Sequence, residues 1–200
     1  MIGQLIAEAA KLFSGARARW VGCAPDTRSR VYFANHTSHF DFVVLWATLP
    51  RPVRERTRPV AGSDYWNRGW LRRYLAGHAF RAVLIDREHV TRDTNPVEAL
   101  EAALRNGDSL ILFPEGTRCP GLEIQEFKSG LFHLLHTMPD VEAVPAYIDN
   151  LNRVLPKGEL LPVPFLCSVT FGAPLRLAAG EGKVPFLARA RAAVEALRDL

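Results

Sequence analysis

The order of apolar segments along this 200-residue chain is the feature that most restricts its fold. Short strand-like runs alternate with helical stretches, and no repeat, low-complexity tract or linker divides them. This alternation is typical of α/β domains, because parallel strands need helical connections that cover the sheet. We therefore predict an α/β fold: a single domain with a mostly parallel central sheet flanked by helices.

The individual elements are predicted from periodicity and from turn residues. Asn95-Pro96 opens a helix and Asn106-Gly107 ends it, while the prolines of segment 150–164 indicate an extended loop. The expected strands are 31–34, 80–85, 109–113, 141–147 and 165–171, and the expected helices are 39–48, 66–76, 95–104, 129–137 and an amphipathic C-terminal helix with Phe186, Leu187, Ala190, Val194 and Leu197 on one face.

Residues 2–13 carry apolar side chains at helical spacing, which predicts an N-terminal amphipathic helix. This helix either packs onto the domain or lies in a membrane interface. No run of about 18 apolar residues occurs, so a spanning helix is not expected, and Glu8 and Lys11 argue against a secretory signal. We divide the chain into residues 1–20, the possibly membrane-associating helix, and residues 21–200, the main domain.

Positive charge gathers in one part of the chain. The formal net charge is +4, but residues 51–92 alone hold ten arginines and four acidic residues. Such a cluster favours an anionic partner, either a membrane surface, a phosphorylated substrate or an acidic carrier. Nucleic acid is not expected, because no binding module is recognisable. The three cysteines have no metal-ligand spacing and are expected to be reduced thiols.

The segment Asn35-His36-Thr37-Ser38-His39-Phe40-Asp41 offers a base and a carboxylate. His36 and Asp41 would point about 140° apart on a helix and to opposite sides of a strand, so they meet only if the chain turns between them. A strand-to-helix junction is predicted at this place. Asp41 would then hold one imidazole nitrogen and leave the other to accept a substrate proton.

Other readings of this segment remain open. Ser38 to Asp41 also fits a capping box, in which Asp41 would serve the helix alone. His36 and His39 have the spacing of a metal pair, but no third ligand is evident, so no metal is expected. Ser38 lacks the Gly-x-Ser-x-Gly elbow of a nucleophile.

A second motif, Phe113-Pro114-Glu115-Gly116-Thr117-Arg118, follows an apolar strand. Pro114 stops the ladder, Gly116 permits an unusual backbone angle, and Thr117, Arg118 and the main-chain N–H groups of the turn suit an anion. Glu115 could orient Arg118 or accept a hydrogen bond from a substrate hydroxyl.

Two weaker segments complete the set. Arg87 follows the strand ending at Ile85, and Pro145 lies within a later strand, where proline indicates an edge strand or a contact surface. Ligands of open α/β sheets gather beyond the carboxyl ends of strands, where we expect all four segments to converge.

In this order, the four segments resemble the blocks of the glycerolipid acyltransferases, which acylate lysophosphatidic acid and related acceptors. The His-x4-Asp block matches at His36 and Asp41, the second block at residues 85–87, the third in full at residues 113–118, and the fourth at Val144-Pro145. The resemblance covers about 110 residues, and its first and third blocks are the specific ones.

The resemblance implies that His36, oriented by Asp41, is the general base on the acceptor hydroxyl. Arg87, Glu115, Gly116, Thr117 and Arg118 would bind the acceptor's phosphate and glycerol. The acyl donor would be an acyl-carrier-protein or coenzyme A thioester, used as a co-substrate and without any cofactor. The resemblance also implies that Pro145 shapes the acyl or acceptor pocket.

The implied acceptor is a lysolipid, by default 1-acylglycerol-3-phosphate giving phosphatidic acid, although a lyso-ornithine lipid would use the same blocks. A non-catalytic lipid- or phosphate-binding module, and a thioesterase or lipase, are the alternatives. The modest N-terminal helix and arginines such as Arg72 and Arg73 imply peripheral attachment to an anionic membrane surface, at the cytoplasmic face.

Overall fold

The computed structural model of the chain describes residues 2–38, 40–66, 69–86, 96–119, 123–149 and 167–200. It confirms the α/β prediction with one sheet of seven strands in the order β1-β7-β6-β2-β5-β3-β4. The strands are β1 (Arg17–Trp20), β2 (Arg30–Ala34), β3 (Thr57–Gly62), β4 (Val83–Ile85), β5 (Ser109–Leu112), β6 (Glu142–Asp149) and β7 (Ser168–Phe171).

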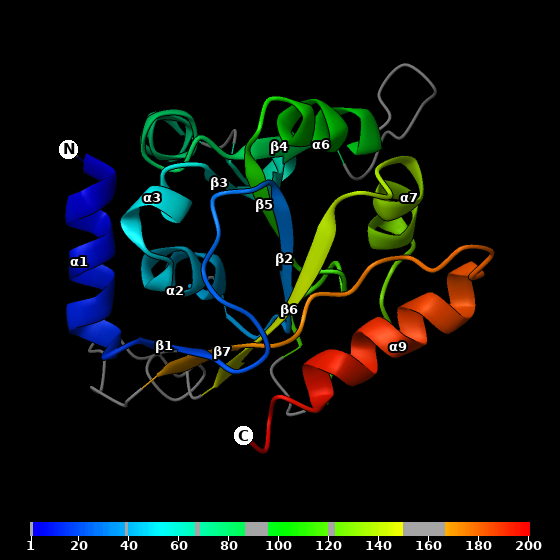
Figure 1. Ribbon diagram of the computed structural model, residues 1–200. Coiled ribbons are helices and arrows are strands. Elements are labelled where there is room, and N and C mark those ends of the chain that lie inside the picture. Colours follow the sequence, from blue (N-terminus) through cyan, green and yellow to red (C-terminus); the bar gives the residue numbers. More distant parts are fainter. Residues whose placement is uncertain (1, 39, 67–68, 87–95, 120–122, 150–166) are drawn as a thin grey trace.

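Helices cover both faces of this sheet (Figure 1). One face carries the N-terminal helix α1 and helix α2, and the other carries α6, α7 and α9. The described helical segments are α1 (Ile2–Ser14), α2 (Asp41–Thr48), α3 (Arg51–Arg54), α4 (Ser63–Trp66), α5 (Trp70–Tyr74), the π-helix η1 (Leu75–Ala79), α6 (Pro96–Arg105), α7 (Gly130–Thr137) and α9 (Lys183–Glu195).

The sheet is parallel from β6 through β4, and only β6 and β7 pair antiparallel. The carboxyl ends of β2, β5, β3 and β4 therefore share one edge of the sheet, which we call the carboxyl edge, and their first residues share the opposite amino edge. Alternating side chains of β2 show how the core divides. Tyr32 packs on the α1–α2 side and Phe33 on the α7–α9 side, and both are fully buried.

Two strands, β1 and β3, were not predicted from the sequence, because one is polar and the other contains a proline. β1 is a short edge strand with two exposed arginines, so it lacks the apolar run that marks an interior strand. β3 contains Pro59 within the arginine-rich segment. β3 pairs with β5 up to Pro59 and with β4 only from Val60 onward. The N–H group that Pro59 lacks is therefore not needed for pairing with β4.

The prediction that Pro145 marks an edge strand is wrong, because β6 lies between β2 and β7. Pro145 pairs with Phe33 and precedes Ala146, where the ladder to β7 begins, so proline is tolerated inside the sheet. The predicted loop 150–164 lies outside the described residues. The predicted face of the C-terminal helix is confirmed, since Phe186, Ala190 and Val194 are fully buried.

Helix α1 packs onto the domain, which is one of the two arrangements considered for it, and the arrangement in a membrane interface stays a prediction. Its small residues, among them the fully buried Ala7, face α2 and η1, and a methyl group on Gly3 would meet the Trp46 ring at 3.2 Å. Ile6 also packs against the core, but other large apolar side chains lie on another side, where Leu12 is 81% and Phe13 61% exposed. No helix among the described residues has the length and apolar character to cross a membrane.

Candidate active site

The two specific motifs meet at the carboxyl edge. His36 follows β2, Asp41 opens α2, and residues 113–118 follow β5, the strand that pairs with β2. The predicted turn between His36 and Asp41 is present, and it brings His36 Nδ1 to 2.8 Å from Asp41 Oδ2. The structure therefore joins a histidine and a carboxylate that neither a continuous helix nor a continuous strand could join.

Asp41 is fully buried and is held by main-chain donors as well as by the imidazole. Its Oδ2 accepts hydrogen bonds from the N–H groups of Thr37 at 2.6 Å and Ser38 at 2.8 Å. An ionised carboxylate can only accept hydrogen bonds, so Nδ1 of His36 carries the proton and Nε2 is left as an acceptor. The same carboxylate thus orders the turn before α2 and fixes the tautomer of His36.

The capping-box reading is confirmed in one half, because the side chain of Asp41 accepts from the N–H of Ser38, three residues before it, while the reciprocal bond to the Ser38 hydroxyl is absent from the described contacts. The residue before α2 is Phe40, and no side chain caps the helix. The Ser38 hydroxyl accepts from the Phe40 N–H at 3.2 Å, so it stabilises the turn. His39 lies outside the described residues, and among those described no group of three or more His, Cys, Asp or Glu side chains is placed to hold a metal.

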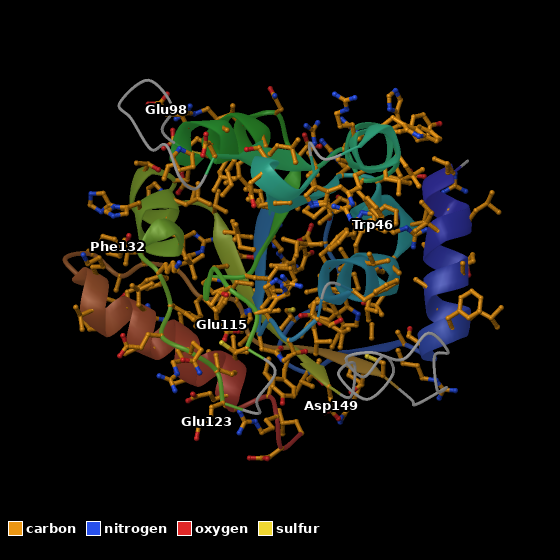
Figure 2. The ribbon with its side chains drawn as sticks, turned by 180° about the vertical axis from the view of Figure 1, so that it is seen from behind. Trp46, Glu98, Glu115, Glu123, Phe132 and Asp149 are labelled. Atoms are coloured by element: carbon orange, nitrogen blue, oxygen red, sulfur yellow. The ribbon has the colours of Figure 1, made fainter. Side chains whose placement is uncertain are left out.

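Glu115 joins the second motif to the first. Its side chain is buried, and its Oε1 accepts from the His36 N–H at 2.7 Å while Oε2 accepts from the Gln125 N–H at 3.0 Å. Figure 2 shows Glu115 at the same end of the sheet as Asp149, the last residue of β6. Binding of the lipid acceptor by Glu115 stays a prediction. In the structure, the Glu115 carboxylate holds the main chain of His36 in place.

Two further contacts position His36. The Cys119 N–H donates to the His36 carbonyl oxygen at 2.9 Å, and the ring of Phe113 stacks on the imidazole with centroids 4.3 Å apart. Phe113 was not among the predicted site residues, although its place at the start of the second motif was the available signal. The ring, the N–H and the C=O of His36 are therefore all fixed before any substrate binds.

Gly116, Thr117 and Arg118 form the turn after Glu115. Gly116 has φ +70°, as expected of a position that needs glycine, but its N–H donates to Phe113 O at 3.0 Å and so is not the free donor expected for an anion. Thr117 and Arg118 are exposed beside the His36 loop. A methyl group on Gly116 would meet the Lys128 side chain at 2.8 Å, so this lysine lies over the turn as a second cation, although it was not among the predicted site residues.

Asn35 and Cys167 are the other polar groups near the pair. The buried Asn35 amide donates to Ile148 O at 3.1 Å and accepts from Ile148 N–H at 2.8 Å, which extends the β2–β6 connection to the residue before His36. Burial, together with the charges of Asp41 and Asp149, raises the pKa of the Cys167 thiol to about 12. Cys167 is thus a protonated structural thiol and no nucleophile near neutral pH.

Arg87 and Pro145 are the remaining predicted site residues. Arg87 lies outside the described residues. Pro145 lies four residues before the end of β6, and its ring packs near Gly172 and Leu197 on the α9 side of the sheet. Pro145 pairs with Phe33, which also pairs with Leu112, the last residue of β5, so Pro145 lies level with the carboxyl edge although β6 continues to Asp149. Its implied role in shaping a pocket stays a prediction.

Comparisons with known proteins agree with the motifs. The model of the Acyltransferase family matches residues 23–149. A 1-acyl-sn-glycerol-3-phosphate acyltransferase of Haemophilus influenzae is 30% identical over 110 residues, which are 52% of this chain and 41% of that protein. A lyso-ornithine lipid O-acyltransferase of Rhodobacter capsulatus is 33% identical over 127 residues, or 63% of this chain and 42% of that protein.

Among solved structures, the 1-acyl-sn-glycerophosphate acyltransferase PlsC of Thermotoga maritima has a similar fold. The TM-score is 0.75 at 17% sequence identity, and the match covers 98% of this chain and 77% of that chain. The curated relatives are longer, since the chain covers between 38% and 51% of the length of each of the five.

Proposed function

The chain belongs to the Acyltransferase family, and from that premise we propose that it is an O-acyltransferase that moves a fatty acyl group from a thioester to the hydroxyl of a lysolipid. The observation that carries the proposal is the 2.8 Å contact between His36 Nδ1 and Asp41 Oδ2 beside the turn of Arg118. A base with a fixed tautomer, next to exposed cations, suits deprotonation of an alcohol whose own head group is anionic.

The proposed reaction uses His36 Nε2 as general base. Nε2 takes the proton of the acceptor hydroxyl while the hydroxyl oxygen forms a bond to the thioester carbonyl carbon. The carbon–sulfur bond then breaks, and the leaving thiolate receives the proton from His36. A positioned base contributes about 10²- to 10⁴-fold to such a rate, so alignment of the two substrates must supply the rest. The step needs no metal or bound cofactor from the protein.

The proposed acceptor is 1-acylglycerol-3-phosphate, giving phosphatidic acid. Three observations support it: the named acceptor of relatives such as the Haemophilus influenzae and Escherichia coli proteins, the exposed guanidinium of Arg118, and Lys128 over the Gly116 turn. Lyso-ornithine lipid is the second candidate, because two relatives are named for that acceptor. The proposed donor is acyl carrier protein or coenzyme A thioester.

A single assay separates the proposals. Purified protein is incubated with labelled acyl thioester and a panel of lysolipids, and products are identified by mass spectrometry. Acceptor-dependent lipid product that falls at least about 10²-fold in His36→Ala, but not in His133→Ala on helix α7, is the expected result. Thioester loss without acceptor would mean a hydrolase, and lipid binding without turnover a non-catalytic module.

The assay also tests the two cations of the turn. Arg118→Ala and Lys128→Ala should raise KM for a phosphate-bearing acceptor about tenfold or more, because a charge-assisted hydrogen bond is lost, and should leave KM for the thioester nearly unchanged. Equal losses for both substrates would argue against phosphate recognition at this turn.

We also propose peripheral association with an anionic membrane, at its cytoplasmic face. The support is the exposed apolar side of α1, in which Leu12 and Phe13 lie opposite to the helix surface that packs on α2. The double variant Leu12→Ser and Phe13→Ser should sediment less with anionic vesicles. A matched variant, Val184→Ser with Leu200→Ser, removes two exposed apolar side chains elsewhere and should bind as the wild type does. Equal binding of both variants would refute a role for α1.

A further inference from the structure

A basic pocket lies at the amino edge of the sheet, away from His36. It has a volume of about 570 Å³ and is formed where the first turn of α1 approaches α3, the start of β3 and the end of η1. β2 spans five residues at about 3.3 Å each, which separates the amino edge from the carboxyl edge by about 15 Å. In Figure 2, Trp46 of the pocket and Glu115 of the candidate active site lie in different parts of the molecule.

The charged lining of this pocket is strongly one-sided. Four arginines line it against a single acidic residue, Glu55, which is already paired with Arg51 at 2.7 Å. Apolar side chains supply much of the remaining wall. The four arginines are Arg51, Arg54, Arg58 and Arg81, and the apolar contributors include Ile2, Leu5, Trp46 and Phe80.

Arg54 gives the strongest evidence for an anion site, because its positive charge is buried and no carboxylate contacts it among the described residues. Arg54 as a whole residue is 3% exposed. Its guanidinium donates hydrogen bonds to Leu49 O at 3.0 Å, to Ala47 O at 3.4 Å and to Oε1 of Gln4. No ion pair to Arg54 occurs among the described residues. Burial lowers the pKa of Arg54, which is the mark of an incompletely compensated positive charge.

Arg30 shows what compensation looks like elsewhere at the same edge. It is equally buried, but its guanidinium meets Glu142 Oε2 at 3.0 Å and 3.1 Å. In the pocket, Arg58 contacts Asp108 at 2.5 Å, yet its Nε is buried and has no hydrogen-bond partner within the described part of the chain. The pocket thus holds more guanidinium charge and donor capacity than its own carboxylates satisfy.

Two lining arginines remain at the surface. The Arg51 side chain is 70% exposed, and Arg81 is exposed with φ +51°, a left-handed conformation that non-glycine residues rarely adopt. An anion entering the pocket would meet these two first and would approach the buried charge of Arg54 behind them. The two N–H groups on one side of a guanidinium can bind two oxygens of a phosphate at once, so arginines around a pocket suit a phosphate ligand.

We propose that this pocket binds a phosphate-bearing ligand with an apolar body, at a site separate from the candidate active site. The phosphate oxygens contact the guanidinium groups of Arg51 and Arg81, and the apolar part lies against Leu5 and Phe80. The ligand is either a phospholipid, reached through the exposed side of α1, or a soluble phosphate ester. This site does not depend on acyl transfer and remains if the proposed function fails.

The test measures binding by calorimetry on the full chain. The probes are dihexanoyl phosphatidic acid and glycerol 3-phosphate, with dihexanoyl phosphatidylcholine as the lipid without an anionic head group. We expect phosphatidic acid to bind, and the double variant Arg51→Gln with Arg81→Gln to weaken it at least about tenfold. The control Arg105→Gln with Arg191→Gln removes two arginines from equivalent helical pairs with glutamate and should bind like the wild type.

Further outcomes decide the source and the place of binding. Glycerol 3-phosphate binding as tightly as phosphatidic acid would identify a soluble ester, and tighter binding of phosphatidic acid a lipid. Loss of binding in Arg118→Gln, with the pocket variant unaffected, would move the ligand to the candidate active site and overturn the proposal. Absence of binding by both phosphate probes would also overturn it. Arg81→Glu, a charge reversal at an exposed position, repeats the test if the double variant unfolds at a lower temperature.

Discussion

The two edges of the sheet hold buried charge in opposite ways. At the carboxyl edge the buried carboxylate of Asp41 accepts hydrogen bonds at Oδ2 from two main-chain N–H groups and from the imidazole of His36, a side chain that can act as a base. In the pocket at the amino edge the buried charge is that of Arg54, whose guanidinium donates to main-chain carbonyl oxygens and cannot release its proton in the accessible pH range.

This difference separates chemistry from binding. An imidazole can accept a proton and return it during a reaction, and the carboxyl edge holds the ring of His36 in a fixed orientation. A permanent charge can only be offset by an anion, and the amino edge leaves room for one. Four predictions, from the largest expected effect to the smallest, test how firmly each edge is built.

Asp41→Asn should have the largest effect. The amide keeps the shape but loses the negative charge that fixes the Nδ1–H tautomer of His36, so we expect kcat for acyl transfer to fall about 10²- to 10⁴-fold. Steady-state kinetics measures this. Asp140→Asn, in an exposed turn, is the matched control and should be unchanged. More than half of the wild-type kcat in Asp41→Asn would show that Asp41 serves the turn alone.

Glu115→Ala should reduce the free energy of unfolding by about 2 to 4 kcal/mol, because the N–H groups of His36 and Gln125 lose their acceptors. Glu115→Gln keeps one acceptor oxygen and should lose about half as much. Urea denaturation measures both. Glu123→Ala, at an exposed position, should change stability by less than about 0.5 kcal/mol. A Glu115→Ala protein as stable as Glu123→Ala would contradict the bracing role.

Gly116→Ala tests the turn that carries Arg118. Gly116 has φ +70° and Gly180 has φ +74°, so alanine at either position costs about 1 to 2 kcal/mol in backbone strain. Only at Gly116 does the added methyl meet a side chain, that of Lys128, whereas nothing lies within 4 Å at Gly180. We expect similar unfolding free energies for the two variants, and a higher acceptor KM only in Gly116→Ala. Equal acceptor KM values would mean that Lys128 takes no part.

The ion pair of Glu142 and Arg30 should have the smallest effect. Burial alone would raise the pKa of Glu142, but hydrogen bonds from Arg176 and Arg30 outweigh it and leave this pKa lowered. A lowered pKa gives stability that is present above the pKa of the unfolded chain and is lost as pH falls through the lower folded value. The contribution is at most about 1 kcal/mol, because Glu142 remains partly solvated.

Thermal unfolding between pH 3 and pH 7 measures this term. Glu142→Gln should be less stable than the wild type at pH 7 and should lose less stability on acidification. If the stability of the two proteins fell with pH by the same amount, other carboxylates would be responsible for the loss of stability in acid.

The predictable part of this molecule consists of features with short-range signals. The strands around Phe33 and Leu110, the helix opened by Pro96, and the two motifs at strand ends all follow from local periodicity and turn residues. The convergence of these motifs follows from the parallel sheet, since consecutive parallel strands end at one edge. Pro145 shows the limit, because its block was placed correctly in a strand, but the neighbours of that strand in the sheet were not predicted.

The sequence by itself determined the α/β class, the family and the pairing of His36 with Asp41, which are five residues apart and need only one turn. The tertiary structure alone decided that Glu115 braces His36 across 79 residues, and that the arginines around Arg54 surround one pocket. The physical reason is that such contacts depend on strand register and on which side of a helix faces the core. Neither is encoded in the spacing of the residues concerned.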